Sequence, residues 1–109
     1  MFYQDFARIK AQFNNNISAC YSLLKDFTQA DIYNNAAIME DPDYFDAYLR
    51  KCELYEDTCE YTMAVKMAEW ILQKVGDDPD YEYLCEQCEL LIEEVEPKIA
   101  DEDNDKKEF

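Results

Sequence analysis

Residues 76–97, GDDPDYEYLCEQCELLIEEVEP, predict one complete helix that carries an acidic stripe. Asp78 is placed to cap its start, and Pro79 suits the first helical position. Gly76 can close the preceding helix, and Pro97 marks the end of this one. The chain therefore has a helix bounded at both ends, around which the other segments are arranged.

Two faces of this helix differ in chemistry. Apolar residues recur three and four positions apart on the expected core face: Tyr81, Leu84, Cys88, Leu91, Ile92 and Val95. Glutamates recur at the same spacings on another face: Glu82, Glu86, Glu89, Glu93 and Glu96. No Lys or Arg lies between Lys74 and Lys98, so these carboxylates lack the intrahelical partners that usually neutralise an exposed face.

An apolar face also runs through the first quarter of the chain. It continues from residue 2 to about residue 28 on Phe2, Phe6, Ile9, Phe13, Ile17, Cys20, Tyr21, Leu24 and Phe27. Asn14, Asn15 and Asn16 allow one long helix or two hinged helices, and the unbroken phase of the apolar face favours one. This face can pack on the chain's own core or on a second copy, which leaves a homodimer open.

Three shorter helices are expected, at residues 31–39, at residues 41–56 and from Thr58 to Gly76. Asp31 would enter the first, Asp41-Pro42 would open the second, and Thr58 would cap the third. One Gly, three Pro and the absence of an alternating strand pattern favour an all-α fold. We therefore expect a small bundle of four to five helices with antiparallel helical hairpins.

The length and composition predict one domain. A chain of 109 residues that is 49% hydrophobic can bury a core, so we expect a single helical domain over residues 1–97. Residues 98–109 are acidic and without periodicity, which predicts a disordered tail. No signal peptide or long apolar run is present, so a soluble cytoplasmic protein with five reduced cysteines is the expectation.

A zinc site is one interpretation of the cysteines. Cys85 and Cys88 form a CxxC pair, and Cys52 and Cys59 could complete four thiolates. The pair lies inside a predicted helix without turn residues, and neighbouring glutamates disfavour thiolates. We therefore expect packing roles for these thiols and no bound metal.

Other catalytic and cofactor motifs are incomplete. Asp101, Asp103 and Asp105 imitate the opening of a calcium loop, but the required glycine is absent. The chain has no His and no phosphate-binding glycine loop, and no Ser or Lys stands in a nucleophilic setting. Neither a cofactor nor enzymatic activity is expected.

Charge divides the chain into two parts. The formal net charge is −16, yet residues 1–39 hold three acidic and three basic residues, so residues 40–109 carry the whole excess. Such a field repels nucleic acid and anionic membranes and attracts basic surfaces, including the grooves in which other proteins hold DNA or RNA.

The tetrapeptide DPDY occurs twice, at residues 41–44 and 78–81. Between the two copies the chain resembles a tetratricopeptide helical hairpin at four positions: Tyr48, Cys52, Tyr55 and Ala64. That resemblance implies a protein–protein adaptor. A generic antiparallel helix pair accounts for the same residues.

Carboxylates are dense enough to imitate a nucleic acid. Residues 77–96 hold nine of them, about one per 3.3 Å of helix, close to the ~3.4 Å per phosphate of a DNA strand. A second set precedes it at Asp41, Asp43, Asp46, Glu53, Glu56, Asp57 and Glu60. Acidic residues also simply keep small helical proteins soluble.

This acidic character resembles that of small phage-encoded DNA-mimic inhibitors, including anti-CRISPR proteins. The resemblance implies a protein that blocks the basic groove of a nucleic-acid-binding protein, such as a CRISPR effector, in the host cytoplasm. Tyr83 is the best candidate for an exposed anchor, whereas Tyr44 and Tyr81 can pack on the core. The expected partner-binding residues are Asp41, Asp43, Asp46, Glu53, Glu56, Asp57, Asp77, Asp78, Asp80, Glu82, Tyr83, Glu86, Glu89 and Glu93.

Overall fold

Five α-helices and one short 3-10 turn make up the fold. The computed structural model describes the backbone of residues 3–107 and the side chains of residues 5–100. The elements are α1 (Tyr3–Leu23), α2 (Phe27–Glu40), α3 (Asp46–Asp57), α4 (Tyr61–Val75), the 3-10 turn η1 (Pro79–Tyr81) and α5 (Glu82–Lys107). No strand occurs between residues 3 and 107, and the predicted all-α bundle of helical hairpins is confirmed.

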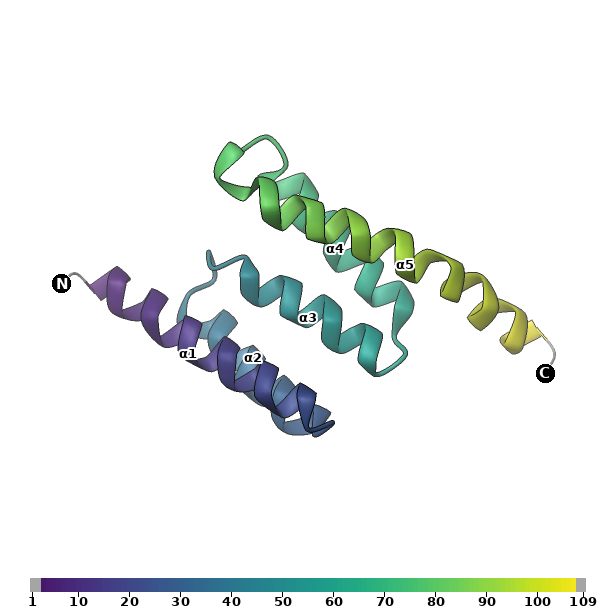
Figure 1. Cartoon of the computed structure of the whole chain (residues 1–109), viewed down its shortest axis with the longest axis horizontal. Helices are drawn as coiled ribbons and strands as arrows, with labels where there is room; N and C mark the ends of the chain where they lie inside the picture. Colours follow the sequence, from purple (N-terminus) through teal and green to yellow (C-terminus); the bar gives the residue numbers. More distant parts are fainter. Residues whose placement is uncertain (1–2, 108–109) are drawn as a thin grey trace.

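Two helical hairpins lie on either side of α3 (Figure 1). α1 packs along α2 at one edge, α4 packs along α5 at the other, and α3 contacts both pairs. The molecule measures 57 × 33 × 18 Å and is therefore a slab about two helices thick. Among the described residues, no helix is long and apolar enough to cross a membrane.

The larger core lies between α3, α4 and α5. Its buried residues are Cys52, Ala64, Val65, Ala68, Ile71, Val75, Leu84, Cys88, Leu91 and Val95. Aromatic rings extend it toward the start of α3: the ring centroids of Phe45 and Tyr81 are 5.6 Å apart, and those of Tyr48 and Trp70 are 4.9 Å apart. The core face predicted for residues 81–95 is confirmed.

α1 and α2 pack through small residues. Their buried positions are Ala7, Ala11, Asn15 and Ser18 on α1, and Ala30, Asn34 and Ala37 on α2. Small side chains let the two helices approach closely, and this contact decides which face of α1 is covered. The core face predicted for α1 is therefore wrong, because its exposed large side chains are Phe6, Phe13, Ile17 and Leu24.

α1 also ends earlier than its apolar periodicity indicates. The predicted single helix across residues 14–16 is confirmed, but it stops at Leu23 rather than near residue 28. Lys25 adopts a positive φ of 61° and turns the chain. Asp26 then caps the next helix, since its carboxylate accepts a 3.2 Å hydrogen bond from the backbone N–H three residues on. α2 consequently begins at Phe27 instead of position 31.

The two DPDY motifs fold alike, as turns rather than as helix starts. The Asp41 carboxylate accepts a hydrogen bond from the Asp43 N–H at 3.1 Å, and Asp78 accepts one from the Asp80 N–H at 2.9 Å. Such Asp-centred turns satisfy the backbone without helical geometry. α3 and α5 begin only after these turns, later than predicted.

Thr58 belongs to the end of α3 and not to the start of α4. Its hydroxyl donates to the Leu54 carbonyl at 3.0 Å and lies 2.7 Å from the Glu60 carboxylate. Cys59 has a positive φ of 63°, which separates Thr58 from the helix that it was expected to cap. α4 begins at Tyr61, after Glu60.

Gly76 closes α4 as predicted. Its N–H donates to the Leu72 carbonyl at 2.8 Å. A side-chain carbon at this position would lie 2.3 Å from the same oxygen, so the close approach requires glycine.

Pro97 lies inside α5 and does not end it. The helix continues to residue 107, so the tail expected to be disordered is helical over 98–107, and residues 108–109 lie outside the described range. Pro97 is exposed, and the carbonyl that loses its N–H partner can bind water instead. Beyond it, Ile99 packs on the core and Lys98 lies 3.9 Å from the Glu56 carboxylate.

Candidate protein-interaction surface

A row of carboxylates follows the outside of α5. We call it the acidic ridge, and its members are Glu82, Glu86, Glu89 and Glu93. All four are exposed, and they lie opposite the buried side of the helix. Within residues 5–100, none of them forms an ion pair. The ridge therefore presents uncompensated carboxylates on one face of a regular helix, as the sequence predicts.

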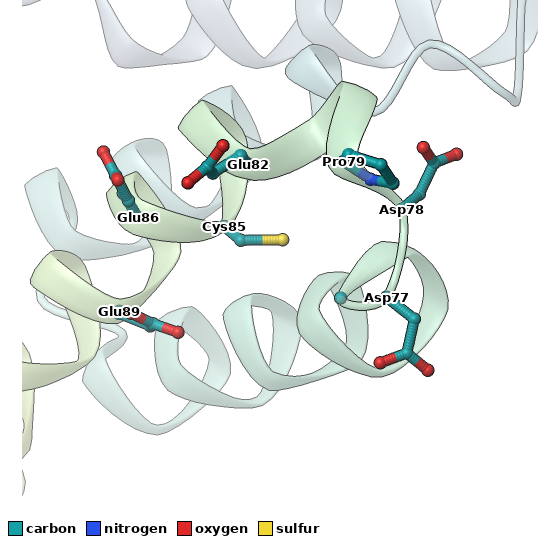
Figure 2. A pocket seen from close by; sticks show the side chains of 8 residues that line it. Asp77, Asp78, Pro79, Glu82, Cys85, Glu86 and Glu89 are labelled. Atoms are coloured by element: carbon teal, nitrogen blue, oxygen red, sulfur yellow. The ribbon is translucent and has the colours of Figure 1, made fainter.

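A hollow of about 530 Å³ borders the ridge where α4 leads into α5. It is lined by Gly76, Asp77, Asp78, Pro79, Glu82, Cys85, Glu86 and Glu89. Figure 2 shows the Cys85 thiol pointing into the hollow, with the ridge carboxylates on one side of it and the Asp77–Asp78 turn on the other. Asp77, Asp78 and Asp80, which were predicted to bind a partner, are exposed at this end of the ridge.

The second acidic set is partly neutralised by basic side chains. Asp41 accepts a hydrogen bond from the Arg8 guanidinium of α1 and is mostly buried. This hydrogen bond is the main reason why the pKa of Arg8 is raised. Asp43 and Asp46 are exposed, and neither forms an ion pair within the described side chains.

The second half of that set lines a groove between α3 and α5. Arg50 lies 3.1 Å from the Glu53 carboxylate, and Lys98 lies 3.9 Å from that of Glu56. Burial is the largest cause of a raised pKa at Glu53, Glu56 and Asp57, because it disfavours the charged form. The charge of this set is thus weaker and more dependent on pH than a count of acids indicates.

Glu94 belongs to the same groove and was missed in the sequence. The groove has a volume of about 290 Å³ and is lined by Leu49, Glu53, Glu56, Asp57, Gln87, Leu90, Leu91 and Glu94. Glu94 raises the pKa of Glu56 from across the groove. It lies on the flank of α5 with Gln87 and Leu90, at spacings of seven and four, and this pattern could have identified it.

The tyrosine predictions agree with the structure. Tyr83 is 73% exposed on α5, near the start of the acidic ridge. Tyr81 packs edge-on against Phe45 in the larger core. Tyr44 packs on the smaller core beneath Arg8, whose guanidinium carbon lies 5.3 Å from the ring centroid.

A separate apolar hollow of about 310 Å³ opens between α3 and α4. It is lined by Tyr48, Met63, Lys66, Met67 and Trp70. The sequence analysis missed it because the periodicity of α4 was interpreted only as a core face. Met63, Met67 and Trp70 repeat at spacings of four and three, so they form a second apolar stripe on the same helix.

The four candidate zinc ligands have different environments. Cys52 and Cys88 are buried in the larger core, and burial raises the pKa of both thiols, that of Cys88 to about 12. The Cys85 sulfur lies 3.9 Å from the Val75 carbonyl, and Cys59 is exposed in a turn. Within residues 5–100, no group of three or more His, Cys, Asp or Glu side chains could hold a metal ion. The side chains of Asp101, Asp103 and Asp105 lie outside this range.

Comparisons with protein-family models, with curated proteins and with solved structures found no match to this chain.

Proposed function

We propose that this protein is a non-catalytic inhibitor that occupies the basic groove of a nucleic-acid-binding protein of the host, such as a CRISPR effector. The observation that carries the proposal is the acidic ridge of α5. Its carboxylates are exposed, lie on one helix face and form no ion pair within the described side chains. A surface that only maintained solubility would not need its charges aligned and unpaired.

A regular helix holds these charges at fixed spacing. Glu82 and Glu93 are eleven residues apart, which is about 16 Å along a helix and comparable to five phosphates of one DNA strand at ~3.4 Å each. The like charges of the ridge repel one another within the fold. A basic partner would remove that repulsion on binding, and it would be attracted over a long range at low salt.

The hollow beside the ridge gives this attraction a specific form. Five carboxylates line it, and its volume of about 530 Å³ leaves room for a guanidinium or ammonium group. Arg and Lys side chains that normally contact phosphates would here contact Asp78, Glu82 and Glu86 instead. Tyr83 would lie beside them as an exposed ring at the edge of the interface.

Within the proposal, the ridge contributes more than the second acidic set. Asp41, Glu53 and Glu56 already have basic partners in the fold, so a target would have to displace these partners. Asp43 and Asp46 remain exposed and extend the acidic surface over the start of α3. Binding should therefore follow the charge of α5 first.

The test is a competition assay. A panel of purified nucleic-acid-binding proteins that includes CRISPR effectors is loaded with labelled duplex DNA or guide RNA, and the chain is titrated in. We expect the chain to displace the nucleic acid from its target, with an affinity that falls by about tenfold or more between 50 and 200 mM salt. Binding that is insensitive to salt and is not competed by nucleic acid would contradict charge mimicry.

The apolar hollow between α3 and α4 supports a second candidate, a tetratricopeptide-like adaptor. Tyr48, Met67 and Trp70 give it an apolar lining suited to an aromatic or aliphatic side chain of a peptide. Such a ligand would bind with little salt dependence. The same salt titration therefore separates the two functions.

A further inference from the structure

The largest apolar side chains of α1 point away from the protein. We call them the outer face: Phe6, Phe13, Ile17 and Leu24. Their exposed fractions are 52%, 63%, 38% and 76% in that order. A solvated helix of a small soluble protein normally carries polar residues at such positions, so this face requires an explanation.

The outer face lies opposite α3. α1 meets α3 through Ala11 and through Arg8, which stacks over Tyr44. At 100° per residue, Arg8 and Asn15 lie about 160–180° around the helix from Phe6 and Leu24. No other helix of the described chain covers that side of α1, and α3 separates it from α4 and α5 (Figure 1).

α2 contributes further apolar surface to this hairpin. Ile32 and Met39 are 53% and 82% exposed and seven residues apart, so they share one face of α2. At about 200 Å² for a fully exposed large side chain, these two and the outer face together expose on the order of 700 Å². A stable homodimer buries about 800 Å² per partner, of which about 65% is apolar. The exposed apolar area is therefore sufficient for a dimer.

Charge identifies what can cover this surface. The chain has a net charge of −16, but residues 1–39 hold equal numbers of acidic and basic residues. Two copies that approached through α3, α4 or α5 would bring unpaired carboxylates together. Two copies that approach through α1 keep those carboxylates on opposite sides of the assembly, whereas a basic protein would find no charge to bind there.

We propose that two copies of the chain form a symmetrical dimer through the outer face, with α1 of one copy against α1 of the other. Phe6 and Phe13 are seven residues apart, as are Ile17 and Leu24, and this is the spacing with which side chains interlock between paired helices. The two α1–α2 hairpins then form a four-helix layer. This dimer does not depend on the proposed inhibitory function.

The oligomeric state in solution tests the proposal directly. Light scattering or sedimentation should give twice the mass of one chain at micromolar concentration. Raising the salt from 50 to 500 mM should strengthen the dimer, since it screens repulsion between two chains of charge −16. This response is opposite to that expected for binding of a basic target.

Substitutions in the outer face should give monomers that keep the fold. Phe13→Glu or Ile17→Glu should weaken dimerisation by about a hundredfold or more, because a two-fold interface buries each new charge twice. The helical circular dichroism and the thermal midpoint should change little in the monomer, since neither residue is in a core. Phe13→Ala provides a milder variant if a charge disturbs α1.

Leu90→Glu is the matched control, because Leu90 is 57% exposed on α5 and distant from α1 (Figure 1). This variant should remain a dimer. The proposal is overturned if the unmodified chain is monomeric at every concentration and salt. It is also overturned if Phe13→Glu stays folded and dimeric, or if a different protein covers the outer face of a monomer.

Discussion

The Ser18 hydroxyl of α1 donates a buried hydrogen bond of 2.7 Å to the Ala30 carbonyl of α2. Both residues are fully buried, and a bond between a side chain and the opposite backbone requires the two helices to lie close together. Small residues make this approach feasible along the whole contact. The position of α1, and with it the exposure of its outer face, follows from this close packing.

Enlarging a small residue in this contact should separate the helices. Ala11→Leu places a large side chain at a site with no exposure, and overpacking of this kind costs about 1–3 kcal/mol. We expect a lower thermal midpoint and a lower free energy of unfolding in urea. Ala100→Leu is the control, since Ala100 is exposed and should tolerate the change. Equal effects of the two substitutions would argue against close packing of α1 and α2.

Mild acid should stabilise the fold. Burial, as the main cause, raises the pKa of Glu53, Glu56 and Asp57 in the folded state above the ordinary values of 4.5 for Glu and 3.8 for Asp. The folded state then binds protons more tightly than the unfolded state, so stability falls as the pH rises through the raised pKa values. The stabilisation is complete only below the ordinary pKa values.

We therefore expect a higher thermal midpoint at pH 5 than at pH 7. Glu53→Gln keeps the shape of the side chain without its charge, and it should stabilise the protein at pH 7 and reduce the dependence on pH. Glu93→Gln on the acidic ridge tests whether removal of any one charge has the same effect. A midpoint that rises steadily from pH 5 to pH 7 in the unmodified chain would refute the expectation.

Reversal of the acidic ridge should abolish inhibition and preserve the fold. The four substitutions Glu82→Lys, Glu86→Lys, Glu89→Lys and Glu93→Lys lie opposite the buried side of α5 and remove like-charge pairs one turn apart. Relief of each pair contributes about 0.2–0.5 kcal/mol, so the thermal midpoint should stay level or rise. The readout is displacement of nucleic acid from the target.

The matched control reverses four acids in the C-terminal segment, at Asp101, Glu102, Asp103 and Asp105. The change in net charge is identical, but these positions follow Ile99, which still packs on the core. This control should retain inhibition. If the control loses activity while the ridge variant keeps it, the protein acts through its C-terminal segment and not through the ridge.

The sequence predicts α5 well because its two faces differ strongly in chemistry. Carboxylates and core residues alternate there with one period, and the structure places them on opposite sides of the helix. The face of α1 was assigned wrongly for a physical reason. Hydrophobic periodicity indicates which side chains favour burial, whereas the actual cover was decided by the close approach that Ala11 and Ser18 permit.

The ends of the helices were harder to predict than their existence. Asp41 and Asp78 match the pattern of a helix cap, yet both close a turn through the N–H two residues on. Pro97 is tolerated because it lies on the exposed side of α5. These outcomes depend on tertiary packing, which local sequence patterns do not contain. The groove at Glu94 was missed for the same reason, since two helices form it.

The order in which the helices pack has a kinetic consequence. Most contacts join neighbours along the chain, from α1 with α2 through to α4 with α5. Such a topology has a low contact order, and helical proteins of this kind fold within about microseconds to milliseconds. The α1–α2 hairpin can also assemble during translation before α5 leaves the ribosome. Productive protein can thus accumulate soon after synthesis begins, without waiting for a pairing between distant segments.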